Sequence, residues 1–268
     1  MKNTAHSADL SHRKQRIAHH FAQASDYDHH ASIQQQVCEL LLTRIAHTYQ
    51  DSVLEVGAGT GQMTRLLAEN IQSKHWVINE LAGRQSPILQ AIFPAAKIMI
   101  GDAEQLDLSS NHSLIISANA VQWFDNPLSF IQQSYERLAS GGQLLFNTFT
   151  PNNFLQIKAL TGQGLAYPTM NKWRLALEKS GFKQITLSTH RFDLPFSKPY
   201  AVLKHMQLTG VSTNQTATSS NDTPFKWTKA RLQQFEREYW QQFAAKNAKG
   251  ELCVNLTYDV LIINAVKP

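Results

Sequence analysis

The sequence predicts an α/β fold in which a mostly parallel, seven-stranded sheet has helices on both faces and a helical lid. One observation is that short apolar runs alternate with amphipathic segments between residues 52 and 116, as in successive strand–helix units. Another is the stretch Val53–Gly61, an apolar run followed by Gly57, Gly59 and Gly61, after which a helix pattern begins. In open α/β sheets, such a strand, glycine turn and helix form a ligand site at the carboxyl end of the first strand.

The remaining elements follow from local patterns. Two helices are expected over residues 10–47, with a break near 25–30, because apolar side chains recur there at helical spacing. Strands are expected at residues 52–56, 75–79, 97–100, 113–117, 143–149, 185–192 and 252–266. Helices are expected at residues 62–71, 86–93, 126–138, 170–180, 197–208 and 228–245, with the pair Gly141-Gly142 ending the third of these. Residues 209–222 are rich in Ser, Thr and Asn and predict a loop.

These elements suggest four segments. Residues 1–50 form an N-terminal helical lid segment, and residues 51–196 form the α/β core that binds a cofactor. Residues 197–247 form a helical insertion that completes the lid, and residues 248–268 return to the core sheet as its last strand region. A lid over the carboxyl ends of the strands would enclose a ligand and exclude water.

Composition narrows the class of protein. The chain has 268 residues, of which 43% are hydrophobic, enough for a full core. No apolar stretch approaches the roughly 18 residues of a membrane span, and the polar N-terminus argues against a signal peptide, so we expect a cytoplasmic protein. Two cysteines, Cys38 and Cys253, are too few for a disulfide framework. Seven of the eleven histidines lie in the first 47 positions, but adjacent pairs point in different directions, and we expect no metal site.

The formal charge of +5 permits an acidic partner, either nucleic acid or an acidic protein. The Lys and Arg residues are scattered, without a dense basic run or a known RNA-binding motif, so the charge alone does not choose between them.

The glycine turn indicates which ligand is bound. A dinucleotide fingerprint needs glycine at its first, third and sixth positions, whereas here the sixth is Gln62 and glycine falls on the fifth, Gly61. Glu55, two residues before the first glycine, would repel a phosphate and suits a ligand with an ammonium or sulfonium group. The alternative is a glycine turn with no ligand. The pattern resembles motif I of the class I S-adenosylmethionine-dependent methyltransferases, which have a Rossmann-like fold.

That resemblance implies S-adenosyl-L-methionine as the cofactor, contacted by the turn residues Gly57, Ala58, Gly59 and Gly61. Glu80 ends the second strand, 23 residues after Gly57, where an acid accepts hydrogen bonds from ribose hydroxyls in related folds. The alternative for Glu80 is an ordinary surface acid at a strand end.

Three further positions follow from the same resemblance. Leu81 is placed to pack against the adenine, and Asp102, after the third strand, to meet the adenine amino group, with the backbone amide of Ala103 nearby. The alternative for Asp102 is a helix cap.

The loop after the fourth strand, Ser117–Phe124, is expected to face the transferred methyl group, which makes Asn119 and Trp123 site candidates. Their alternatives are a turn residue and a core-filling aromatic.

Three segments narrow the family: Phe21–Gln36, Ala120–Trp123 and Leu256–Tyr258. Together with motif I they resemble the malonyl-[acyl-carrier protein] O-methyltransferases of biotin synthesis, over most of the chain. The resemblance implies methylation of the free carboxylate of a malonyl group on acyl carrier protein, whose acidic surface would suit the positive charge. It also implies that Tyr27 lies in the lid near the cofactor and the substrate carboxylate, with Gln34 as a neighbour.

Two departures from the family pattern stand out. Ala58 replaces a Cys that many relatives carry, a neutral change. Gln207 stands where relatives tend to have a Lys, so Lys204 or Arg191 would have to supply the cation that binds the substrate carboxylate.

Two alternative functions remain open. One is a methyltransferase that acts on another small carboxylic acid or metabolite. The other is a non-catalytic or RNA-directed protein that binds S-adenosylmethionine, against which the intact Glu80, Asp102 and glycine turn argue. We expect a monomer with Tyr27 and Trp123 as catalytic residues, acyl carrier protein as partner, and no binding to nucleic acid or membrane.

Overall fold

The structure is a computed structural model, and it describes residues 14, 15, 18, 31–209 and 227–268. The chain divides into two compact units. Unit 1 consists of residues 1–148, 169–188 and 261–268, and unit 2 of residues 149–168 and 189–260. Their boundaries differ from those of the four expected segments because two long strands, β6 (Lys183–Phe196) and β8 (Leu252–Val266), contribute residues to both units.

The sheet has the expected parallel core. Its main path runs β3-β2-β1-β4-β5-β8-β6, and the short strand β7 pairs antiparallel with β8. The pairs β1·β2, β1·β4, β2·β3 and β4·β5 are all parallel. The bounds are β1 Tyr49–Val56, β2 Gln72–Glu80, β3 Lys97–Ile100, β4 His112–Ser117, β5 Leu138–Phe149 and β7 Ala244–Lys246. The seven predicted strands are confirmed. Strand order reverses between β1 and β4, and ligands of such sheets bind at that switch point.

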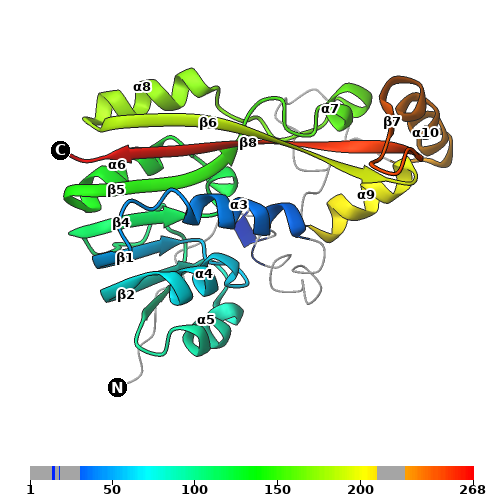
Figure 1. The fold of residues 1–268 in the computed structure, drawn as a ribbon. Helices are drawn as coiled ribbons and strands as arrows, with labels where there is room; N and C mark the ends of the chain where they lie inside the picture. The colour runs from blue at the N-terminus through cyan, green and yellow to red at the C-terminus, as the bar shows by residue number, and fades with distance from the viewer. Residues whose placement is uncertain (1–13, 16–17, 19–30, 210–226) are drawn as a thin grey trace. The chain divides into compact units, whose positions relative to one another are not determined.

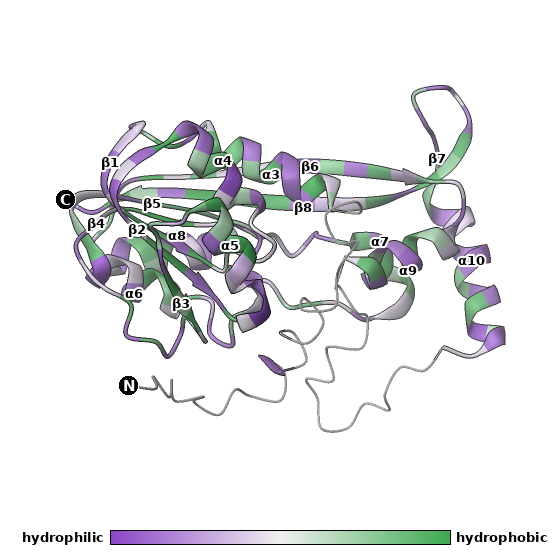
Figure 2. Cartoon of the chain, turned by 90° about the horizontal axis from the view of Figure 1, so that it is seen from below, coloured by the Kyte–Doolittle hydropathy of each residue, from purple (hydrophilic) through white to green (hydrophobic). Residues whose placement is uncertain are grey.

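The helices of unit 1 cover both faces of its sheet (Figure 1). Their bounds are α3 Ser32–Leu42, α4 Gln62–Asn70, α5 Ser86–Ile92, α6 Ser129–Arg137 and α8 Met170–Ser180, with short 3-10 turns η1 Gly83–Gln85 and η2 Val121–Trp123. Leu54 and Val56 of β1 pack in one cluster with Phe130 of α6 and Trp173 of α8. Glu55, which points to the other face, hydrogen-bonds Thr64 of α4. Apolar residues predominate along β5 and β8, whereas the helices alternate apolar and polar residues along their length (Figure 2).

One local expectation was wrong. Gly141 and Gly142 were expected to end a helix, but α6 ends at Arg137 and both glycines lie within β5. Pairing between β4 and β5 shifts register just after His112, and a Cβ on Gly142 would come within 2.9 Å of the His112 carbonyl oxygen. The glycines therefore lie at an irregularity in strand pairing, where a side chain on Gly142 would collide with the neighbouring backbone.

Unit 2 contains α7 (Leu155–Thr161), α9 (Pro199–Leu208) and α10 (Lys229–Phe243). The helices expected at 197–208 and 228–245 are confirmed, whereas α7 and β7 were not predicted. Side-chain hydrogen bonds connect these helices to β8: Tyr239 donates its hydroxyl to the Asn255 carbonyl at 2.8 Å, and His205 Nε2 lies 2.7 Å from the Tyr258 hydroxyl.

Candidate functional site

A pocket in unit 1 lies at the carboxyl ends of β1 to β4, at the switch point of the sheet. It contains about 900 Å³ of empty space, part of it open to solvent. It is lined by ten of the predicted site residues: Glu55, Gly57, Ala58, Gly59, Glu80, Leu81, Asp102, Ala103, Asn119 and Trp123. Gln34 and Gly61 do not line it. Tyr27 lies outside the described residues.

The glycine turn lies close to neighbouring segments of the chain, and glycine makes this approach possible. Gly57 has φ +72°, and a Cβ there would stand 2.4 Å from the Cβ of Ala120, so no larger residue fits. The N–H groups of Gly57 and Ala58 both donate to the Asn79 carbonyl at 3.0 Å, which fixes the turn to the end of β2. Gly61 begins α4 with φ +84°, and a Cβ there would meet Ile92 Cδ1 at 2.7 Å. Gly61 therefore allows α4 to pack against α5.

Glu80 connects the two neighbouring loops. Its Oε2 accepts the N–H of Gly59 at 2.7 Å, and its Oε1 accepts the N–H of Ala82 at 2.8 Å. Burial raises the pKa of Glu80 above its ordinary value, against the lowering effect of these hydrogen bonds. A carboxylate offers about four acceptor sites, so Glu80 keeps capacity for ligand hydroxyls.

Glu55 is a buried acid at the pocket wall. It is 1% exposed, its Oε1 accepts the Thr64 hydroxyl at 3.0 Å, and its Oε2 has no partner among the described residues. Burial, together with the nearby Glu80, raises the pKa of Glu55 to about 8, although the Thr64 hydrogen bond opposes the change. An unsatisfied buried acceptor at a pocket wall is a fitting partner for a cationic or hydrogen-bond-donating ligand group.

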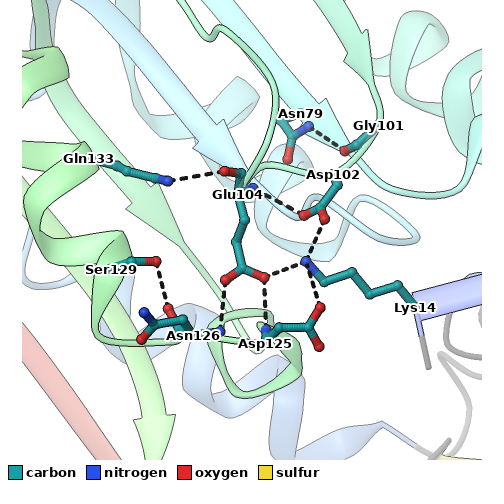
Figure 3. Close-up of polar contacts among 9 residues, drawn as sticks. All are labelled: Lys14, Asn79, Gly101, Asp102, Glu104, Asp125, Asn126, Ser129 and Gln133. Atoms are coloured by element: carbon teal, nitrogen blue, oxygen red, sulfur yellow. Dashed lines mark hydrogen bonds and ion pairs between the residues drawn. The ribbon is translucent and has the colours of Figure 1, made fainter. Parts of the chain in front are cut away.

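Asp102 lies at the other side of the pocket in a dense polar cluster (Figure 3). Its Oδ1 accepts the N–H of Glu104 at 3.0 Å, and its Oδ2 lies 2.5 Å from the ammonium of Lys14. The side-chain amide of Asn79 donates to the carbonyls of Met99 and Gly101 at 3.1 and 3.0 Å. These bonds hold the end of β3 beside β2 and so fix the backbone position at which Asp102 follows.

Asn119 adopts a left-handed conformation with φ +54°, which Asn tolerates better than most residues. Its N–H donates to Asn147 Oδ1 at 2.8 Å, and its side-chain amide donates to the Gln34 carbonyl at 3.2 Å. Asn119 is thus both a turn residue and a lining residue, and it connects the β4 loop with α3 and β5. Trp123 ends η2 and also lines the pocket.

Sequence reasoning missed several lining residues, among them Lys14, Ala18, Cys38, Asn79 and Phe124. Asn79 had a usable signal, because it is a buried polar residue directly before the predicted strand-end acid. Phe124 lies in the loop predicted to face the methyl group, beside Trp123, but was not singled out. Lys14, Ala18 and Cys38 come from distant segments with no local pattern. In the described part of the chain, no group of three His, Cys, Asp or Glu side chains is arranged to hold a metal ion. None of the described helices has the length and apolar character needed to cross a bilayer.

Comparison with known proteins agrees with this geometry. A family model described as a methyltransferase domain matches residues 11–187. The malonyl-[acyl-carrier protein] O-methyltransferase of Haemophilus ducreyi is 36% identical, over 95% of this chain and 97% of its own length. The same-named protein of Haemophilus influenzae is 34% identical, over 94% of each.

The chain belongs to the malonyl-[acyl-carrier protein] O-methyltransferase family. The resemblance seen in the sequence is confirmed, as is the prediction of a methyltransferase. Among solved structures, phosphoethanolamine N-methyltransferase 2 of Haemonchus contortus, in complex with S-adenosyl-L-methionine, has the same fold. Its TM-score is 0.56 at 13% identity, over 94% of this chain and 57% of that protein.

The pocket fits the cofactor of such enzymes. It offers an acid at the end of β2, a second acid after β3, a glycine turn that leaves the backbone accessible, and a buried oxygen on Glu55 that has no partner in the described part of the chain. These groups match a ligand with ribose hydroxyls, an adenine amino group and an ammonium group.

Proposed function

We propose that this enzyme transfers a methyl group from S-adenosyl-L-methionine to the free carboxylate of malonyl-acyl carrier protein and so forms its methyl ester. The observation that carries the proposal is the pair of relatives named for this activity, each aligned over nearly the whole of both chains. The formal charge of +5 supports it, since an acidic carrier protein is drawn to a basic surface. Its product would enter biotin synthesis in the cytoplasm.

The cofactor supplies an electrophilic methyl group on a sulfonium. In our assignment Glu80 accepts hydrogen bonds from the ribose hydroxyls, and Leu81 packs on the adenine ring. Asp102 accepts a hydrogen bond from the adenine amino group, and the backbone N–H of Ala103 lies beside the same edge of the ring. Gly57 and Gly59 let the backbone approach the rest of the ligand, where Glu55 faces the ammonium group. Support for these roles comes from the shared pocket that these residues line.

The acceptor needs no general base in this mechanism. A malonyl carboxylate is ionised at pH 7, because ordinary carboxyl groups titrate near pH 4. The enzyme's task is to hold this carboxylate in line with the methyl group, and such positioning can contribute about 7–11 kcal/mol. Trp123 and Phe124, which line the pocket, would exclude water from the reacting atoms.

We assign the binding of the malonyl carboxylate to the hydroxyl of Tyr27 and to a cationic side chain. Arg191 is engaged by Asp193, with Nε 3.0 Å from Oδ2 and Nη2 3.2 Å from Oδ1. Lys204 is exposed on α9, one turn before Gln207, which occupies the position where the family tends to have Lys. We therefore favour Lys204 as the carboxylate-binding cation.

The direct test is methyl transfer from labelled S-adenosyl-L-methionine to malonyl-acyl carrier protein, with malonyl-coenzyme A, free malonate and RNA as parallel acceptors. We expect label on the carrier protein, released by mild base as an ester would be. Label on free malonate or RNA alone would refute the proposed acceptor while leaving the methyltransferase assignment intact. No label on any acceptor, in the presence of cofactor binding, would refute the proposed activity.

A further inference from the structure

Lys14 places an ammonium group among three carboxylates at the edge of the cofactor pocket (Figure 3). Its Nζ lies 2.5 Å from Asp102 Oδ2 and 3.6 Å from Asp125 Oδ2, and it also donates to Glu104 Oε2. The residue is only 4% exposed, so this is a buried ionic cluster rather than a solvated surface pair.

The acids of the cluster also accept backbone N–H groups. Glu104 accepts the N–H groups of Asp125 and Asn126, each at 2.8 Å, and Asp102 accepts the N–H of Glu104 at 3.0 Å. Burial alone would lower the pKa of Lys14, but its hydrogen bonds to Asp102 and Glu104 raise it above the ordinary value. Lys14 is therefore the counter-ion that allows two buried carboxylates to lie side by side.

Lys14 leaves room for a ligand on Asp102. The carboxylate has about four acceptor sites, and the protein uses one on each oxygen. Lys14 itself lines the pocket, as does Ala18, which is also helical and four positions further along the chain. Lys14 and Ala18 are therefore the described residues of the N-terminal segment that form part of the pocket wall.

We propose that Lys14 is a positioning residue of the cofactor site, which holds Asp102 in the orientation that accepts the adenine amino group. The inference rests on the proposed role of Asp102 and extends it to a residue 88 positions away in sequence. Without the ammonium, Asp102 and Glu104 repel one another, and Asp102 turns away from the adenine edge. Lys14 thus makes the discrimination between a 6-amino and a 6-oxo purine depend on the N-terminal segment.

The test is a binding comparison of two ligands, S-adenosylhomocysteine and S-inosylhomocysteine, which differ in the 6-amino or 6-oxo group of the purine. The 6-oxo purine also carries a proton on N1, where adenine has an acceptor. Affinities are measured by calorimetry for the full-length wild type, K14M, K14R and D102N. Lys74 gives a matched control, because it pairs with Asp51 at 2.7 Å on the exposed surface and lies away from the pocket. K74M removes a solvent-exposed Lys–Asp pair without touching the cluster.

We expect K14M to bind S-adenosylhomocysteine about tenfold more weakly, the effect of about 1.4 kcal/mol. It should lose most of the preference for the 6-amino purine, whereas K14R restores part of it and K74M leaves both affinities unchanged. An equal loss for both ligands, or wild-type selectivity in K14M, would overturn the role of Lys14. If D102N also retains wild-type selectivity, the adenine assignment of Asp102 fails, and with it this inference, but the methyl-transfer assay still decides the proposed activity.

Discussion

Gly59 donates its backbone N–H to Oε2 of Glu80 at 2.7 Å, so the acid that ends β2 holds the glycine turn that follows β1. The sequence suggests two separate cofactor elements, a flexible turn and a ribose acceptor. In the folded chain the turn and the acid are linked by this hydrogen bond, and Glu80 also accepts the N–H of Ala82 on its other oxygen. A change at Glu80 therefore affects the ligand, the turn and the loop after β2 together.

Substitution of Glu80 should weaken cofactor binding and also lower stability. E80A leaves the N–H groups of Gly59 and Ala82 without their acceptor, at a cost of about 1–3 kcal/mol in unfolding free energy. We expect the affinity for S-adenosylhomocysteine to fall by about tenfold or more, since ribose hydroxyls also lose a charged acceptor. Urea unfolding and calorimetry measure the two effects. Unchanged affinity in a folded E80A protein would refute the ribose assignment.

The glycines of the turn should respond differently to alanine. At Gly57, the Cβ would stand 2.4 Å from the Cβ of Ala120, so G57A should cost about 2–4 kcal/mol of stability through both crowding and strain. Gly59 has φ +57° but no described residue within 4 Å of its Cβ position, so G59A should cost about 1–2 kcal/mol.

The ligand should separate these two variants further. Gly59 lines the pocket, so the added methyl of G59A takes ligand space and should reduce affinity for S-adenosylhomocysteine. Thermal unfolding with and without ligand measures both effects. Equal stabilities for G57A and G59A would contradict the predicted crowding, and full ligand stabilisation of G59A would contradict the close approach.

Lys204 should matter for the acceptor and not for the cofactor. If its ammonium binds the malonyl carboxylate, K204M should raise the KM for malonyl-acyl carrier protein by about tenfold, as expected for loss of a charged hydrogen bond. R191M should change it much less, because the Arg191 guanidinium already faces Asp193. K172M, an exposed Lys change on α8, is the matched control. The reverse order of effects would transfer the role to Arg191.

Tyr27 should contribute to turnover. Y27F removes only the hydroxyl that we place at the substrate carboxylate, so kcat/KM for the carrier substrate should fall by about tenfold or more, the effect of one hydrogen bond to a charged group. Affinity for S-adenosylhomocysteine should change little. Steady-state methylation and calorimetry on the same protein separate the two quantities. Wild-type turnover in Y27F would remove Tyr27 from the site.

The sequence predicts the glycine turn and the strand-end acids because each depends on a few adjacent residues. Val53–Gly61 contains the end of β1 and the turn, and α4 begins at the next residue, Gln62. Glu80 and Asp102 each come two positions after an apolar run. The same locality explains the wrong expectation for Gly141 and Gly142. A glycine pair after a helix pattern usually ends the helix, and only the pairing of β5 with His112 shows its other use.

Contacts between residues far apart in the sequence could not be predicted from local patterns. The Lys14–Asp102 pair spans 88 positions, and no periodicity in either segment indicates it. The contact between Asn119 and Gln34 spans 85 positions in the same way. The short helix α7 has only seven residues, too few to show a helical period.

The buried Glu55 should make stability depend on pH. Its folded pKa of about 8 lies above the ordinary value of 4.5, so the folded state holds a proton that the unfolded state releases. Stability is therefore lost as pH rises from about 4.5 to about 8. E55Q, which is neutral at every pH, should remove this loss. Because one pKa unit corresponds to about 1.4 kcal/mol, we expect E55Q to gain about 3–4 kcal/mol relative to wild type between pH 5 and pH 8.

Urea unfolding of both proteins at pH 5 and pH 8 measures this difference, and other titrating groups cancel because they are common to both. The same substitution tests the ligand role of Glu55. A neutral amide cannot become the carboxylate that faces the cofactor's ammonium group, so E55Q should be the more stable protein at pH 8 and yet the weaker binder. A stability difference that does not change with pH would show that Glu55 is ionised in the folded protein.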